Sequence, residues 1–213
     1  MAGATGLVGR EVLAALLADK RYTVVHAVGR RVPTVQHLKL HSHVTDLGAS
    51  LRLPDIPQID DVFIALGTTI RIAGSQPAFR AIDLDAVVAL ARSAKARGAS
   101  KLGVVSSMGA SPESSIFYSR VKGEMEAAVG LLGYRTLIIA RPSMLDGDRA
   151  SLTQAARPAE GLSLVAMRFF KPMIPANYQA ITGAQVARAL IHTLQTTDQG
   201  TRILLSGEMQ RLT

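Results

Sequence analysis

Short apolar segments alternate with helical segments along most of this chain. Apolar runs of strand length lie at Thr23–Val28, Val62–Leu66, Leu102–Val105, Thr136–Ala140 and Arg202–Leu205. Stretches with helical spacing lie at Arg10–Lys20, Gln76–Arg97, Tyr118–Leu132 and Gly183–Leu194. Continuously apolar strands that alternate with helices are typical of a parallel sheet covered by helices on both faces. The pattern therefore predicts an α/β fold with a doubly wound parallel sheet.

The length of 213 residues suits one domain with a substantial core. Tryptophan is absent and aromatic residues make up 4% of the chain, so we expect an aliphatic core. No internal repeat, low-complexity segment or linker indicates a second unit. We predict a single domain over residues 1–213, with residues 146–213 mostly on the substrate side. The least regular segment, Asp146–Asn177, is expected to fold over the functional site.

The charge balance is basic, with 24 Lys and Arg against 16 Asp and Glu. The arginines are scattered and form no block interleaved with aromatic residues, so an arginine-rich surface and an anionic ligand are expected rather than nucleic acid. The absence of cysteine excludes disulfides and thiolate metal sites. No apolar run reaches bilayer length and no basic-then-apolar leader is seen, so we predict no membrane contact and a cytoplasmic location.

A glycine turn opens the chain, in the segment Gly3-Ala4-Thr5-Gly6-Leu7-Val8-Gly9. Its GxxGxxG spacing allows a tight turn, and the amphipathic helix that follows offers its N-terminal N–H groups to a phosphate. Such a turn normally follows a buried strand, yet only Met1 and Ala2 precede it. Either the sequence is shortened here, or these residues form a very short strand. We expect a dinucleotide to contact Gly3, Thr5, Gly6, Leu7 and Val8.

Two adjacent arginines, Arg30 and Arg31, follow the second predicted strand. An acidic residue is usual at this point in NAD sites, because it binds the ribose 2′-hydroxyl. Guanidinium groups instead bind a 2′-phosphate through forked, charged hydrogen bonds. The pair therefore favours NADP(H). Further cofactor contacts are predicted at Asp46 and Leu47 in the adenine pocket and at Gly67, Thr68 and Thr69 after the next strand.

A tyrosine and a lysine lie four residues apart at Tyr118 and Lys122, after a strand that ends in Ser106-Ser107. Residues at i and i+4 share one helical face, so both side chains can reach one site. An ammonium near a phenol favours the phenolate, and a serine hydroxyl can bind a substrate carbonyl. Together with the glycine turn, these residues indicate hydride transfer.

These motifs, with Arg141-Pro142-Ser143, resemble the atypical short-chain dehydrogenases, in the branch that includes the mammalian Tat-interacting metastasis suppressor and bacterial relatives. The resemblance spans nearly the whole chain. It implies a Rossmann-type sheet with a small C-terminal substrate region, and NADP(H) binding.

Matched residue by residue, the resemblance makes Tyr118 the proton donor or acceptor. Lys122 supports that tyrosine and binds the nicotinamide ribose. The family serine falls on Ser107, with Ser106 as the alternative. Arg141, Pro142 and Ser143 are expected to line the nicotinamide end of the pocket. Asp83 stands where many relatives carry Asn, which leaves the identity of a fourth catalytic residue open.

The sequence thus predicts an NADP(H)-dependent oxidoreductase that acts on a small carbonyl or alcohol, as a monomer or homodimer. Two alternatives stay open: an NADPH-binding regulatory or sensor protein with little turnover, and a sugar-nucleotide epimerase-like enzyme. A metal site at His37, His41 and His43 is not expected, because no acidic or Cys partner lies at ligand spacing.

Overall fold

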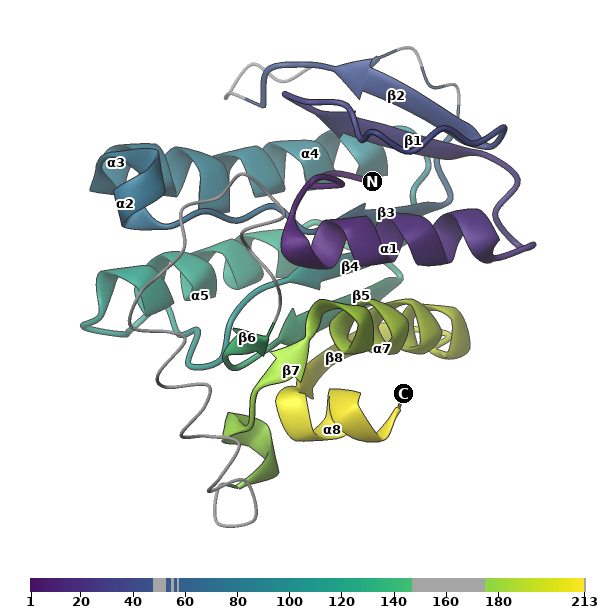
Figure 1. Ribbon diagram of the computed structural model, residues 1–213. Coiled ribbons are helices and arrows are strands. Elements are labelled where there is room, and N and C mark those ends of the chain that lie inside the picture. Colours follow the sequence, from purple (N-terminus) through teal and green to yellow (C-terminus); the bar gives the residue numbers. More distant parts are fainter. Residues whose placement is uncertain (48–52, 55, 57, 147–174, 213) are drawn as a thin grey trace.

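The computed structural model describes residues 1–47, 53–54, 56, 58–146 and 175–212 (Figure 1). β1 (Val25–Gly29) pairs in parallel with β2 (Leu40–Val44). Four further strands pair in parallel in the order β3 (Asp61–Ile64), β4 (Lys101–Val105), β5 (Thr136–Arg141) and β8 (Gly200–Leu205). The predicted α/β class and the parallel sheet are confirmed.

Met1 and Ala2 connect these two groups of strands. Ala2 forms parallel bridges with Val28 of β1 and with Ile64 of β3. The Ala2 N–H donates to the Phe63 carbonyl at 2.9 Å, and the Ala65 N–H donates to the Ala2 carbonyl at 3.0 Å. These two residues therefore take the place of a very short central strand, and the order across the sheet is β2, β1, Ala2, β3, β4, β5, β8. The strand order reverses at Ala2, which is where α/β sheets bind their ligands.

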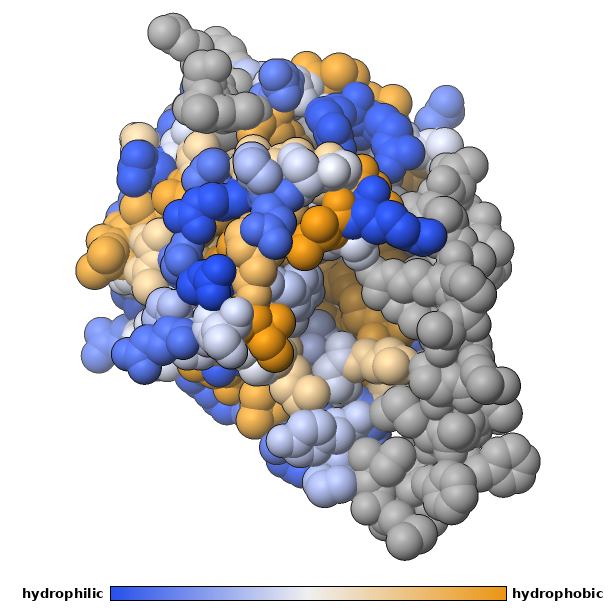
Figure 2. Space-filling model, turned by 90° about the vertical axis from the view of Figure 1, so that its left-hand side faces the viewer, coloured by the Kyte–Doolittle hydropathy of each residue, from blue (hydrophilic) through white to orange (hydrophobic). Residues whose placement is uncertain are grey.

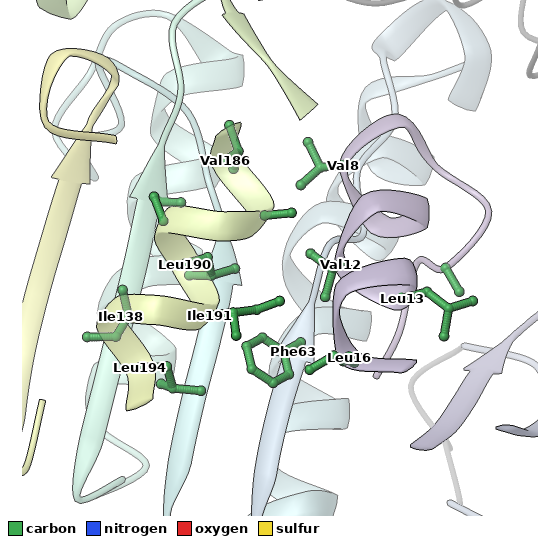
Figure 3. Close-up of a cluster of buried hydrophobic side chains, with 14 of the residues drawn as sticks. Val8, Val12, Leu13, Leu16, Phe63, Ile138, Val186, Leu190, Ile191 and Leu194 are labelled. Carbon is green, nitrogen blue, oxygen red and sulfur yellow. The ribbon is translucent and has the colours of Figure 1, made fainter. Parts of the chain in front are cut away.

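Helices cover both faces of the sheet (Figure 1). On one face α1 (Leu7–Ala18) packs beside α7 (Gly183–Thr196). Figure 3 shows Val12 and Leu16 of α1 directed toward Ile191 of α7 and Phe63 of β3. On the other face lie α4 (Val87–Lys95) and α5 (Phe117–Gly130), whose apolar side chains pack on β3, β4 and β5. One mainly aliphatic core thus lies on each face of the sheet.

The predicted helix over Gln76–Arg97 has three consecutive parts. These are α3 (Gln76–Arg80), the π-helix η1 (Ala81–Ala86) and α4. The short helices α2 (Ile70–Ala73), η4 (Ala176–Tyr178) and α8 (Ser206–Arg211) were not predicted, and neither was the small parallel pair β6 (Leu145–Asp146) and β7 (Ile181–Thr182). Such short elements contain too few residues for a hydrophobic period to be read.

The C-terminal part contributes more to the framework than the expected substrate-side role implies. β8 pairs with β5, and α7 packs against α1 on the sheet. α7 has a buried apolar face, and Leu204 of β8 is buried in the same core, so both elements belong to the framework of the sheet. Most of the segment predicted to fold over the site, residues 147–174, lies outside the described residues.

Candidate functional site

A cavity of about 850 Å³ lies at the carboxyl ends of the parallel strands, around the point where strand order reverses. Figure 2 looks onto this edge, and the molecular surface is hollowed there. The predicted site residues that line the cavity are Gly3, Thr5, Gly6, Leu7, Val8, Arg30, Arg31, Asp46, Leu47, Gly67, Thr68, Thr69, Ser107, Tyr118, Lys122, Pro142 and Ser143. The fold therefore brings together residues that are spread over more than a hundred positions of sequence.

The glycine turn is held tightly between the end of β3 and the start of α1. Gly3 has φ of 84°, and a Cβ there would lie 2.4 Å from the Ala65 carbonyl oxygen. A Cβ on Gly9 would lie 1.9 Å from the Gly3 carbonyl oxygen. Gly6 caps α1 without a side-chain hydrogen bond, so the first turn of α1 has no side-chain acceptor at its cap. An uncapped helix N-terminus in a cavity wall attracts anions.

Ser106 and Ser107 differ sharply in their surroundings. The Ser106 hydroxyl donates to the buried Glu126 carboxylate of α5. The Ser107 hydroxyl is buried at the cavity wall and has no hydrogen-bond partner among the described residues. Both serines line the cavity, so they differ in their hydrogen-bond partners rather than in their access to it. A buried hydroxyl without a partner is costly, so Ser107 fits a site whose ligand completes its hydrogen bond.

Tyr118 and Lys122 reach the cavity from the first two turns of α5. The Tyr118 ring is partly exposed and packs against Phe79, with 5.5 Å between ring centroids. The Lys122 ammonium is buried, and its Nζ lies 2.7 Å from Oδ1 of Asp83. Both side chains are thus held at one wall, as the spacing of four predicts.

Arg141 is the predicted site residue that does not line the cavity. Its guanidinium pairs instead with Glu126, with Nε 3.0 Å from Oε1. Burial of the Glu126 carboxylate requires a counter-charge, which Arg141 supplies from the end of β5. The sequence did not predict Glu126 as a partner of Arg141, although Glu126 lies four residues after Lys122 on the same face of α5. Together Glu126, Arg141 and Ser106 join α5 to the ends of β4 and β5.

The histidines form a contact that the sequence did not predict. His26 Nδ1 lies 2.9 Å from His43 Nε2, and the His26 ring stacks on both His41 and His43. Burial lowers the pKa of His26 and of His43, and the neighbouring histidines add to this shift. Within the described ranges, no group of three or more His, Cys, Asp or Glu side chains is arranged to hold a metal ion.

Residues 3–197 match the model of a family described as NAD(P)H-binding. This chain belongs to that family. Rat HTATIP2 is 34% identical over 212 residues, which cover 97% of this chain and 84% of the rat protein. This relationship confirms the resemblance that the motifs indicated. Another relative, "Protein fmp52, mitochondrial" of Emericella nidulans, is 32% identical over 175 residues, which cover 79% of this chain and 72% of the fungal protein.

Solved structures share the fold at lower identity. MoeE5 in complex with UDP-glucuronic acid and NAD superposes with a TM-score of 0.73 and 21% identity, over 97% of this chain and 75% of MoeE5. UDP-N-acetylglucosamine 4-epimerase from Bacillus cereus gives a TM-score of 0.68 and 14% identity, over 97% of this chain and 77% of the epimerase. These likenesses support the Rossmann-type fold.

The expected cytoplasmic location is wrong by this comparison, because several fungal relatives are named as mitochondrial. The absence of cysteine does not determine a compartment. No helix in the described part of the chain combines the length and the apolar character needed to cross a membrane.

Proposed function

We propose that this protein is an NADP(H)-dependent oxidoreductase acting on a small carbonyl or alcohol through Ser107, Tyr118 and Lys122. One observation carries the proposal: the buried Ser107 hydroxyl has no partner within the described ranges and lines the same cavity as Tyr118 and Lys122. A protein that only senses a nucleotide has no need of a proton donor beside an unpartnered hydroxyl donor.

The residues fit a dinucleotide of this class. The uncapped start of α1 suits a pyrophosphate. The glycine turn fits this role because Gly3 and Gly9 allow its backbone to pack tightly between β3 and α1, where a Cβ on either would clash with backbone atoms. Arg30 and Arg31 line the cavity beyond the end of β1, where they suit a 2′-phosphate. Lys122 would donate hydrogen bonds to the nicotinamide ribose.

Held by the start of α1, Arg30, Arg31 and Lys122, NADPH would supply the hydride that reduces the substrate carbonyl. Ser107 donates a hydrogen bond to the substrate oxygen and stabilises the charge that develops there. Tyr118 donates its phenolic proton to that oxygen, and the Lys122 ammonium stabilises the phenolate that remains. In the oxidative direction Tyr118 accepts the proton.

Cofactor preference provides a test that requires no substrate. We expect NADPH to bind at least about tenfold more tightly than NADH, a difference of about 1.4 kcal/mol. Replacing both Arg30 and Arg31 with alanine should remove most of this difference, because the 2′-phosphate loses its charged partners. Arg92→Ala, an exposed arginine on α4 away from the cavity, is the matched control. Equal affinities of the unmutated protein for the two nucleotides, measured by calorimetry, would contradict the NADP(H) assignment.

Turnover is tested by incubating the protein with NADPH and a panel of aldehydes and ketones. We expect at least one of them to be reduced, and the product of a reaction with C4-deuterated NADPH to carry the label. Tight NADPH binding without transfer to any member of the panel would favour the sensor alternative.

A further inference from the structure

Asp83 makes a buried contact that has no signal in the local sequence. Its side chain is fully buried and its Oδ1 lies 2.7 Å from the Lys122 ammonium, which is itself 4% exposed. The other oxygen, Oδ2, accepts a hydrogen bond from the Thr68 N–H at 2.9 Å. One carboxylate thus contacts both the lysine of α5 and the loop after β3.

The local backbone directs Asp83 toward this point. Asp83 lies in the π-helix η1, which separates α3 from α4. A π-helical turn inserts extra backbone into a helix and is frequent at functional sites. Gly67 adjoins the pair, because a Cβ there would lie 3.5 Å from Asp83 Oδ1 and 3.9 Å from Lys122 Nζ. Asp83, Gly67 and Lys122 all line the cavity, so the ion pair is part of its wall.

The electrostatic surroundings of Asp83 are simple. Burial raises the pKa of Asp83, and the Lys122 ammonium opposes that rise. Within the described part of the chain, Lys122 is the charged side chain in contact with Asp83. Nearby on α3 and α5, Arg80 and Glu124 pair with each other, and Asp85 of η1 is exposed. Tyr118 is the remaining titratable group that shares the α5 face and the cavity with Lys122.

We propose that Asp83 is a positioning residue that acts through Lys122: it fixes the ammonium at the cavity wall and balances the charge that Tyr118 experiences. The proposal rests on the proposed function, in which Lys122 supports the Tyr118 phenolate. A buried ion pair is often no more stabilising than apolar side chains of the same size, so a role in the site explains its presence better than stability does.

Removing the negative charge has an effect of definite sign. In Asp83→Asn the carboxamide oxygen can still accept from the Thr68 N–H, while the ammonium loses its counter-charge. An uncompensated positive charge favours deprotonation of groups near it. The Tyr118 phenolate should therefore form at lower pH in the variant than in the unmutated protein.

The experiment titrates Tyr118 directly and needs no substrate. The full chain with bound NADP⁺ is titrated with base, and phenolate formation is followed by ultraviolet absorbance. The same titration of the matching Tyr118→Phe protein is subtracted, which removes the signal of Tyr22, Tyr134 and Tyr178. We expect the Tyr118 midpoint to fall by about one pH unit in Asp83→Asn. The control Asp85→Asn removes the same charge from an exposed position of the same helix, and its midpoint should match the unmutated protein.

An unchanged Tyr118 midpoint in Asp83→Asn would overturn the inference, because a merely structural carboxylate would leave that titration where it is. Activity of the Tyr118→Phe protein would instead overturn the proposed function, so the two failures are distinguishable.

If Asp83→Asn does not fold, Asp83→Glu provides the test. That variant keeps the charge but displaces the carboxylate, so kcat should fall at least about fivefold while the pH profile is retained. Full kcat in Asp83→Glu would contradict a positioning role.

Discussion

The two serines that follow β4 have the same side chain in different surroundings. Both line the cavity, but the Ser106 hydroxyl is bonded to Glu126, whereas the Ser107 hydroxyl has no partner among the residues that the structure describes. Ser107→Ala should therefore lower kcat by about 10²-fold or more, because a donor to the developing oxyanion is lost.

The matched control for this prediction is Ser106→Ala. Its hydroxyl is already bonded within the protein, so we expect it to lower the free energy of unfolding by about 1–3 kcal/mol, because the buried Glu126 loses a donor. Its effect on kcat should be smaller than that of Ser107→Ala. Steady-state kinetics and urea unfolding of both variants check this, and equal losses of kcat would contradict the assignment of Ser107.

At the residue scale the sequence predicted which side chains line the cavity better than it predicted which residues they pair with. The spacing of four placed Tyr118 and Lys122 on one face, and both line the cavity. The same sequence left Ser106 and Ser107 unresolved, because the direction of each side chain depends on how β4 ends against its neighbours. Arg141 was misplaced because its partner Glu126 lies in another element, and tertiary ion pairs have no local signal.

At the element scale, β1 and β2 carry a pH-sensitive contact. His26 and His43 lie within hydrogen-bonding distance, so one ring must be neutral to accept from the other. Burial lowers the pKa of both below its usual value of about 6.5. As the pH falls through about 6.5, the unfolded chain takes up protons that the folded protein resists, so stability decreases.

We therefore expect the free energy of unfolding to decrease as the pH falls from about 7 to about 5. Replacing both His26 and His43 with glutamine should make that decrease smaller. The control is His37→Gln, because His37 is exposed and lies outside the contact. Urea unfolding across this pH range measures the slopes. A slope in the double variant as steep as in the unmutated protein would show that the pair does not carry the effect.

Long elements were predicted at nearly their observed positions, because an amphipathic helix shows a clear hydrophobic period and a fully buried strand shows a continuous apolar run. The π-helix η1 was not separable from the helix around it, since an extra residue per turn barely changes the period over a few residues. The short helix α2 and the pair β6 and β7 depend on contacts distant in sequence and have no comparable signal.

At the scale of the whole molecule, alternating strands and helices were enough to predict the doubly wound parallel sheet, since right-handed crossovers leave few other arrangements. A very short strand at Met1 and Ala2 was one of two alternatives that the sequence left open, and the structure agrees with it. Its place depends on β1 and β3 presenting facing edges, which only the assembled sheet shows. The cavity follows from the same arrangement, because the strand order reverses at Ala2 and the loops on either side diverge.

Tyr118→Phe tests whether this cavity performs hydride transfer with Tyr118 as the proton donor. The substitution keeps the ring that packs on Phe79 and removes only the transferable proton. We expect NADPH affinity and unfolding midpoint to stay near those of the unmutated protein, while kcat for the reduced carbonyl compound falls by about 10²-fold or more. Tyr178→Phe, at an exposed tyrosine that does not line the cavity, should keep full activity. Full activity in Tyr118→Phe would contradict the account.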